Sequence, residues 1–278
     1  ETTVLTTEFT KDVLEGLSAN PKYLSSKYFY DERGSKIFEA IMRMPEYYLT
    51  DCEIEVFNTH KAAIFEAAGI AHRPFELVEL GAGDGLKTKI LLQHLLKQQT
   101  AFTYMPIDIS VGALEKLETE LRRQFPELKV KSLAGDYFKL LGKINGRLPK
   151  MALFLGSNIG NFEHKQSLHF LKQIHEVLNP GDFLLIGFDL KKPKDIILKA
   201  YSDPHGHTAA FNLNLLQRMN RELGANFNPG QFFHQEIYEE ESGLAKSFLV
   251  SKKPQKVFIR KFNQTFAFAE GEKIFTGQ

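Results

Sequence analysis

Between residues 75 and 188, short apolar runs alternate with segments whose apolar residues recur at helical spacing. The apolar runs are residues 75–80, 102–107, 128–133, 151–155 and 183–188. Each run has the length of a strand, and most are followed by an amphipathic helical pattern, so the five are predicted to form one parallel sheet. Helices between the strands are predicted to cover both faces. The pattern therefore indicates a doubly wound α/β fold.

Two helix starts are marked by capping residues. Thr50 and Glu53 have capping-box spacing, which predicts a helix start at Thr50. Ser110 is the candidate cap of a later helix. The inward residues of that later helix are predicted to be Val111, Leu114, Leu117 and Leu121.

The strand and helix alternation stops after Asp189. Residues 191–221 have a helical pattern, and residues 232–268 are predicted to form several strands or hairpins. We therefore expect a Rossmann-like cofactor domain at residues 58–192. A second, discontinuous α+β region of residues 1–57 and 193–278 is expected to recognise the substrate and cover the ligand edge of the sheet.

Composition excludes several classes of function. The 278 residues carry 35 basic and 34 acidic side chains, a net charge of +1, so strong attraction to nucleic acid or an anionic membrane is not expected. No apolar run approaches the roughly 18–20 residues of a membrane span, and no basic-then-apolar signal opens the sequence. The single cysteine, Cys52, excludes an internal disulfide and a cysteine-based zinc site. A cytoplasmic enzyme is the expectation; the oligomeric state is undetermined, and a monomer is compatible with the sequence.

Histidine spacing gives no metal motif. The nine histidines contain no HExxH or similar arrangement. His205 and His207 stand at alternate positions, where exposed loop histidines are favoured over metal ligands. No metal site is predicted.

Open α/β sheets bind ligands at the carboxyl ends of their strands. The first strand ends in Glu-x-Gly-x-Gly-x-Gly over residues 79–85, in which Gly81 and Gly83 let the backbone approach a ligand closely. This spacing differs from the Gly-x-Gly-x-x-Gly that presents a helix N-terminus to a dinucleotide pyrophosphate. It favours a cofactor without a phosphate at this place, although a purely structural turn has the same residues.

Acidic residues follow the next two strands. Asp108 is placed to accept hydrogen bonds from the two hydroxyls of a ribose, or else to cap the following helix. Asp136 is placed to accept from an adenine amino group, and the neighbouring Tyr137 to pack on the adenine face, although Gly135-Asp136 alone marks only a turn. In this order, one feature per strand end, the residues favour S-adenosylmethionine (SAM) as cofactor.

The fourth strand is followed by a polar turn. Residues 156–161 contain two glycines and two asparagines, among them Asn161. The turn leaves the sheet beside the first strand, so we expect it next to the sulfonium, where an asparagine side chain suits contact with an amine. Asn and Gly are also common simply as turn formers.

Five segments carry a resemblance to a known family. They are YFYDERGS (28–35), PEYY (45–48), FLGSNIGN (154–161), AY (200–201) and TAAFN (208–212). Together they resemble the amino-acid Nα-methyltransferases typified by the histidine-specific, SAM-dependent enzyme of ergothioneine biosynthesis. The resemblance extends from about residue 28 to the end and includes motifs outside the generic cofactor fold.

The resemblance implies a role for individual positions. Cofactor contacts are implied at Gly81, Lys87, Asp108 and Asp136, with Tyr137 beside them. Tyr47 and Tyr201 match the tyrosines that hold the substrate carboxylate, Asn161 matches the residue that faces the amine, and Tyr30 matches a tyrosine at the amine end. Asn161 and Tyr30 are therefore the candidate catalytic residues. The implied reaction is methyl transfer from SAM to the α-amino nitrogen of a small-molecule amino acid.

Two positions depart from the family pattern. Histidine-specific members place a glutamate against the imidazole where this sequence has Gly277, and a methionine where it has Ser247. Family members also continue with a helix and two strands beyond the sequence given. The groups that bind the amino and carboxylate ends are retained, so the acceptor is expected to be histidine or a related small or aromatic amino acid. A non-catalytic adenosine- or amino-acid-binding module, and a nicotinamide-dependent oxidoreductase, are the alternatives.

Overall fold

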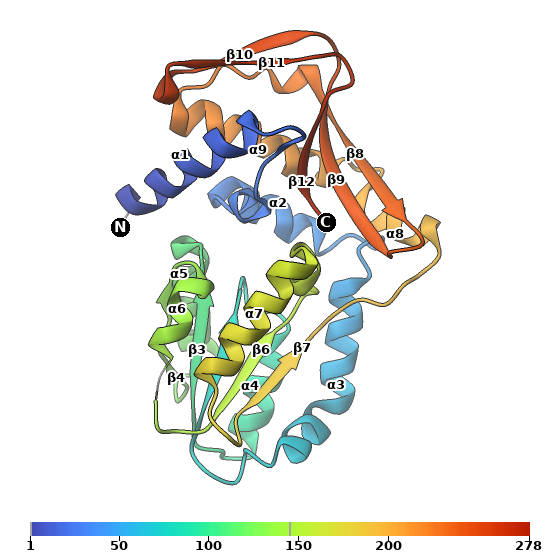
Figure 1. Cartoon of the computed structure of the whole chain (residues 1–278). Helices are drawn as coiled ribbons and strands as arrows, with labels where there is room; N and C mark the ends of the chain where they lie inside the picture. The colour runs from blue at the N-terminus through green and yellow to red at the C-terminus, as the bar shows by residue number, and fades with distance from the viewer. Residues whose placement is uncertain (1, 145) are drawn as a thin grey trace. The chain divides into compact units, whose positions relative to one another are not determined.

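The computed structural model describes residues 2–144 and 146–278, with side chains from residue 8 onward. The chain forms two compact units (Figure 1): Tyr48–Leu190, which we call the parallel-sheet unit, and Glu1–Tyr47 with Lys191–Gln278, which we call the two-segment unit. Helix α3 (Leu49–Ala68) lies wholly in the parallel-sheet unit. The domain boundary expected from the sequence, between residues 57 and 58, would divide this helix.

The parallel-sheet unit contains the predicted sheet. Its strands are β2 (Phe75–Leu80), β3 (Phe102–Asp108), β4 (Lys129–Val130), β5 (Leu133–Ala134), β6 (Lys150–Phe154) and β7 (Phe183–Ile186). The order is β4-β3-β2-β6-β7, all parallel, and β5 also pairs with β3. After β2 the chain builds one half of the sheet and then returns to place β6 on the other side of β2, which makes β2 and β6 the switch point where such sheets bind ligands.

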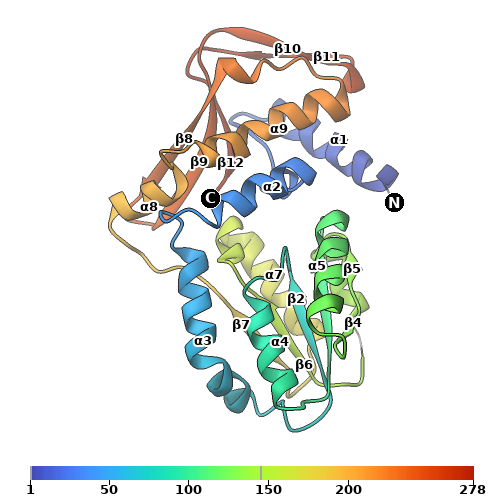
Figure 2. The ribbon, with the colours of Figure 1, turned by 180° about the vertical axis from the view of Figure 1, so that it is seen from behind.

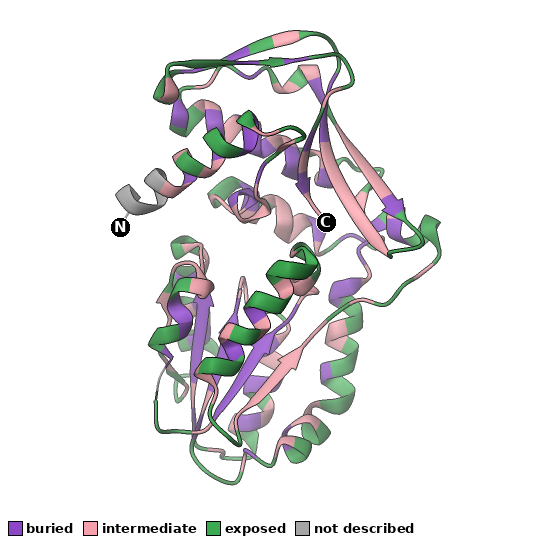
Figure 3. Ribbon diagram, in the orientation of Figure 1, coloured by how far each residue is buried: buried purple, intermediate pink, exposed green. Residues whose placement is uncertain are grey.

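Helices cover both faces of this sheet, as predicted for a doubly wound fold. Helices α3, α4 (Thr88–Lys97) and α5 (Val111–Gln124) pack on one face, and α6 (Tyr137–Leu140) and α7 (His164–Val177) pack on the other. Helix α7 lies in front of the sheet in Figure 1 and α4 lies in front in Figure 2. Figure 3 shows β3 and β6 buried between these layers, with the outer surface of α7 exposed.

Three local predictions are corrected. The third strand is divided into β4 and β5, which meet β3 at separate places on either side of Lys131 and Ser132. Ser110 caps α5 as predicted and Leu114, Leu117 and Leu121 are buried, but Val111, the first residue of that helix, is 48% exposed. Helix α3 begins at Leu49 after Tyr48, so Thr50 already lies inside the helix and is no cap.

The two-segment unit combines helices with antiparallel strands. Its helices are α1 (Thr2–Ser18), α2 (Glu32–Ile41), α8 (Lys194–Tyr201) and α9 (His207–Leu223). Its strands are β1 (Lys22–Tyr23), β8 (Phe232–Glu239), β9 (Leu244–Ser251), β10 (Gln255–Ile259), β11 (Gln264–Phe268) and β12 (Lys273–Gly277). One sheet has the order β1-β12-β9-β8, and β10 and β11 form a hairpin. The predicted helical and strand-rich segments of this unit are therefore confirmed.

Short 3₁₀ helices connect several of these elements. They are η1 (Ser26–Phe29), η2 (Leu141–Lys143), η3 (Asn158–Asn161), η4 (Pro229–Gln231) and η5 (Arg260–Phe262). Within residues 2–144 and 146–278, no helix has the length and apolar character that a membrane span requires.

Candidate functional site

The glycine loop after β2 turns sharply at the carboxyl end of the strand. Gly81, Gly83 and Gly85 have φ angles of 78°, 54° and 64°, in the left-handed region that side chains disfavour. The backbone N–H groups of Gly81 and Ala82 donate to the carbonyl of Ile107 at 2.8 and 3.2 Å. The loop is therefore fixed to the end of β3 and not only to its own strand.

Asp108, at the end of β3, organises this loop. Its two carboxylate oxygens accept from the N–H of Gly83 and the N–H of Ser110, both at 2.8 Å. Burial raises the pKa of Asp108, while these backbone hydrogen bonds oppose that shift. Each carboxylate oxygen has a second lone pair, so both can also accept from the hydroxyls of a ribose.

Glu79, two residues before Gly81, stabilises the start of the glycine loop. Its side chain is buried and accepts hydrogen bonds from the hydroxyls of Thr88, at 2.5 Å, and Tyr104. Burial raises the pKa of Glu79 to about 7, against the effect of the two hydroxyl donors. The group joins β2, β3 and α4 directly beneath the glycines, a role that the sequence motif alone does not reveal.

The end of β5 lies beside Asp108. The N–H of Gly135 donates to the backbone carbonyl of Asp108 at 2.8 Å. The Asp136 side chain caps α6 through the N–H of Phe138 at 2.9 Å. The Tyr137 ring packs edge-on against Phe154, with centroids 5.7 Å apart. The predicted ribose and adenine residues thus come to adjacent strand ends.

The turn after β6 stands next to the glycine loop. Gly156 and Ser157 have positive φ angles and lead into η3, where Asn158 donates to the carbonyl of Leu155 at 2.8 Å. The amide of Asn161 donates to the Asn158 side chain at 3.4 Å. A Cβ atom on Gly81 would lie 3.4 Å from Asn158 Nδ2, which shows how closely the two turns approach.

A charge pair lies at this switch point. Glu53 of α3 accepts from the N–H of Gly156 with both oxygens, at 2.8 and 3.1 Å, and forms an ion pair with Lys87. A Cβ atom on Gly156 would lie 3.1 Å from Lys87 Nζ. One cation and one carboxylate therefore stand together where β2 and β6 end. The resemblance implied Lys87 but not Glu53, whose only sequence signal was the mistaken capping box.

The three predicted site tyrosines, Tyr47 and Tyr201 for the substrate and Tyr30 for catalysis, come together in the two-segment unit. Tyr47 packs against Tyr201 and Phe38, with ring centroids 6.0 and 6.2 Å away. Tyr30 packs against Phe38 and Phe211, both at 5.4 Å. We call these five residues the tyrosine cluster. It joins α2 and the chain on either side of it to α8 and α9.

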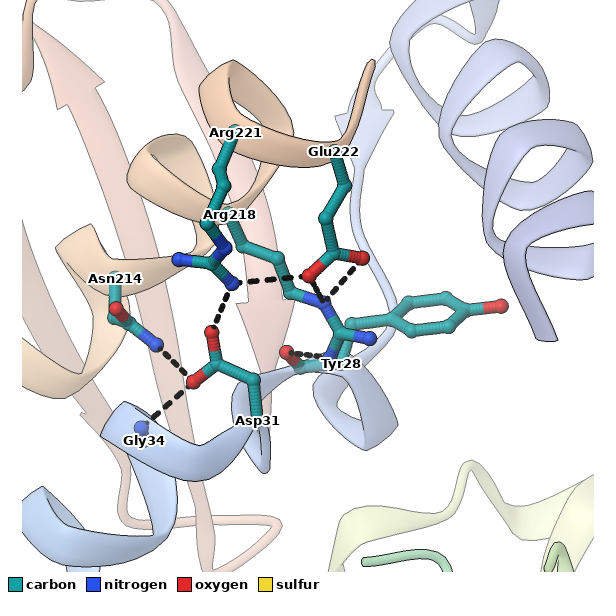
Figure 4. A network of polar contacts seen from close by, with 7 residues as sticks. All are labelled: Tyr28, Asp31, Gly34, Asn214, Arg218, Arg221 and Glu222. Atoms are coloured by element: carbon teal, nitrogen blue, oxygen red, sulfur yellow. Dashed lines mark hydrogen bonds and ion pairs between the residues drawn. The ribbon is translucent and has the colours of Figure 1, made fainter. Parts of the chain in front are cut away.

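A polar network fixes the start of α2 against α9 (Figure 4). Asp31 caps α2 through the N–H of Gly34 at 2.7 Å and accepts from Asn214 and Arg221 at 2.7 and 2.6 Å. Burial raises the pKa of Asp31, but these hydrogen bonds outweigh it and hold the pKa below its ordinary value. Arg218 donates to the carbonyl of Tyr28 at 2.8 Å. The network thus anchors the segment that carries Tyr30.

The two positions at which the resemblance implies a departure from the family pattern are neighbours. Ser247 in β9 and Gly277 in β12 are direct partners in the antiparallel ladder. A Cβ atom on Gly277 would lie 3.5 Å from Ser26 Cβ and 3.9 Å from the Phe29 ring, both in η1. Both positions therefore lie at the same place in the two-segment unit, where β9 pairs with β12.

The predicted site residues divide between the units. Gly81, Gly83, Lys87, Asp108, Asp136, Tyr137 and Asn161 belong to the parallel-sheet unit, and Tyr30, Tyr47 and Tyr201 belong to the two-segment unit. In the part of the chain that the structure describes, no three His, Cys, Asp or Glu residues are grouped as metal ligands.

Comparisons with known proteins match nearly the whole chain to methyltransferases. Residues 9–278 match the family model of the histidine-specific, SAM-dependent methyltransferases. Histidine N-alpha-methyltransferases of Mycolicibacterium smegmatis and Mycobacterium tuberculosis are 36% and 35% identical over 266 residues, 96% of this chain and 82% of each relative. The N-methyltransferase imqF of Aspergillus flavus is 29% identical over 273 residues, 95% of this chain and 73% of that protein.

Proposed function

Because this chain belongs to the family of histidine-specific, SAM-dependent methyltransferases, we propose that it transfers methyl groups from SAM to the α-amino nitrogen of histidine. It is a SAM-dependent N-methyltransferase with the parallel sheet of the class I fold. The two mycobacterial relatives carry the name of this reaction, and a fission yeast relative is named ergothioneine biosynthesis protein 1. We therefore assign the chain to the histidine methylation that ergothioneine biosynthesis requires.

The observation that carries this proposal is the set of side chains at the strand ends of the parallel-sheet unit. Asp108 would accept from the ribose hydroxyls and Asp136 from the adenine amino group, with Tyr137 packing beside it. The Lys87–Glu53 pair matches the methionine end of SAM, which carries one carboxylate and one ammonium on the same carbon. Lys87 would hold the carboxylate and Glu53 the ammonium.

The protein's contribution to the reaction is mainly positioning. SAM supplies an already activated methyl group. Tyr47 and Tyr201 would hold the carboxylate of the amino acid, and the Asn161 amide would orient its nitrogen lone pair. Alignment of two reactants contributes roughly 7–11 kcal/mol to catalysis. The amine must first lose its proton, either to water before binding or through a chain that involves the hydroxyl of Tyr30; we assign no dedicated base.

A screen of the twenty amino acids with methyl-labelled SAM tests the proposal. We expect label transfer to histidine. Transfer to another amino acid alone would replace the proposed acceptor while retaining the reaction class. SAM binding by calorimetry without transfer to any amino acid would instead support a non-catalytic binding module. Membership of the methyltransferase family excludes the nicotinamide-dependent oxidoreductase.

A further inference from the structure

Three positions form a row across the larger sheet of the two-segment unit. Glu236 of β8 pairs with Ser247 of β9, and Ser247 pairs with Gly277 of β12. Side chains of directly paired residues lie on the same face of a sheet. Glu236 therefore shares a face with Ser247, and Gly277 continues the row next to a register shift between Phe275 and Gly277. Ser247 and Gly277 are the two positions at which the resemblance implies a departure from the family. The register that creates this row joins residues far apart in sequence.

The Glu236 carboxylate is buried and held in place. Ser247 Oγ donates to Glu236 Oε2 at 2.5 Å, and His234 Nε2 lies 3.4 Å from the same oxygen. The side chains of His234 and Glu236 are only 2% and 1% exposed. Both contacts are made by Oε2, which leaves Oε1 to accept from a ligand. Among the ion pairs of the described residues, this carboxylate meets a histidine and no lysine or arginine.

The same place adjoins the tyrosine cluster. The direction of a side chain at Gly277 leads to the Phe29 ring, 3.9 Å from a Cβ atom there. Phe29 packs on Phe211 of the tyrosine cluster with ring centroids 4.6 Å apart. Phe211 in turn packs on Tyr30, so the end of the row at Gly277 is connected through Phe29 and Phe211 to the tyrosine proposed for the amine end of the substrate. All of these contacts lie within one unit.

We propose that Glu236 is the specificity residue that accepts a hydrogen bond from the imidazole N–H of the histidine substrate. By the resemblance, the family has a glutamate at the position of Gly277 and a methionine at the position of Ser247. Here the first position has no side chain and the second has a short one, which leaves room for the Glu236 side chain to extend across β9. Neighbouring strands are about 4.8 Å apart, so Glu236 starts about 10 Å from Gly277 and needs that space. A carboxylate on β8 would thus take the place of the one that the family has on β12. This inference rests on the proposed function.

The test compares E236Q with wild type for histidine methylation and for SAM affinity. We expect the KM for histidine to rise by about 10- to 100-fold, because a charge-assisted hydrogen bond is lost, with the dissociation constant of SAM unchanged. E239Q is the matched control: Glu239 lies on the same strand but is exposed and paired with Lys246. This control should keep the wild-type KM.

A second substitution that restores the KM would show that Glu236 recognises the substrate and does not merely stabilise the fold. The double variant E236Q/G277E restores a carboxylate to the row, and a Cβ atom at Gly277 meets only ordinary contacts, so the KM should recover most of the loss. S247A leaves the carboxylate but removes its positioning donor, and should raise the KM by a smaller factor. This second variant also tests the proposal if E236Q does not fold.

Three results would overturn the assignment. E236Q with the wild-type KM, S247A with the wild-type KM, or a loss in folded E236Q that G277E does not repair would each remove Glu236 from substrate recognition. The proposed function fails separately, if wild-type protein methylates no histidine. Methylation of histidine by wild type and E236Q with equal KM would therefore contradict only the role of Glu236.

Discussion

At the scale of single residues, the candidate site depends on carboxylates that already hold the surrounding backbone and side chains by hydrogen bonds when no ligand is bound. Asp108 holds the glycine loop and the start of α5 through two backbone N–H groups, and Glu79 ties three elements together beneath that loop. Such preorganisation means that little rearrangement is needed when a ligand binds. The two residues can therefore be tested separately: Asp108 for its role in ligand binding and Glu79 for the effect of its titration on stability.

Replacing Asp108 with Asn should weaken SAM binding by about 10- to 100-fold, since hydrogen bonds to an ionised group contribute about 1.5–3 kcal/mol. Titration calorimetry with SAM measures the change. Glu115 is an exposed acid on α5, and E115Q serves as the control that should bind normally. An unchanged dissociation constant in D108N would refute the ribose role of Asp108.

Replacing Asn161 with Ala should reduce turnover far more than SAM affinity. The amide is proposed to orient the amine, which matters during methyl transfer, and it has no assigned contact with the cofactor. Steady-state kinetics with histidine and calorimetry with SAM give the two quantities on the same protein. Turnover equal to that of wild type would remove Asn161 from the mechanism.

Glu79 should make stability depend on pH. Its folded pKa of about 7 lies above the ordinary 4.5, so the folded state retains a proton that the unfolded chain releases. The contribution of this proton to stability is complete below pH 4.5 and is lost as the pH rises to about 7, a change on the order of 3 kcal/mol. The difference in unfolding free energy between wild type and E79Q, measured by urea titration, should therefore fall across this window. A constant difference would contradict the raised pKa.

At the scale of elements, α2 depends on α9 for its position. Asp31 caps α2 and reaches two side chains of α9, and Arg218 of α9 holds the carbonyl of Tyr28 just before it. The elements that place Tyr30 and Tyr47 are therefore held from a helix distant in sequence. Sequence patterns predicted the helical character of both segments but not this anchoring, because it is a long-range hydrogen-bond network.

The replacement D31A should destabilise the protein by about 3 kcal/mol, because it leaves the donors of Gly34, Asn214 and Arg221 without their acceptor. Thermal unfolding measures the loss. Glu32 is the neighbouring acid; it is highly exposed and pairs along its own helix with Lys36, so E32A should unfold at nearly the wild-type temperature. Equal melting temperatures for D31A and E32A would show that the network does not support α2.

At the scale of the whole molecule, the sequence predicted what depends on local periodicity. The parallel sheet and the helices between its strands follow from alternating patterns between residues 75 and 188, and the structure confirms them, with the third strand divided into β4 and β5. Contacts between residues far apart in the sequence could not be predicted from local periodicity. The contact of Glu53 with Lys87, and the pairing of Ser247 with both Glu236 and Gly277, depend on packing and strand register that no local spacing encodes.

The identity of the methylated atom is the most direct measurement. Purified protein would be incubated with histidine and methyl-labelled SAM, and the product analysed by NMR spectroscopy. Binding of the amino acid through its carboxylate and amine predicts the labelled methyl group on the α-nitrogen. A methyl group on the imidazole ring, or unmodified histidine after full occupancy by SAM, would contradict the proposed function.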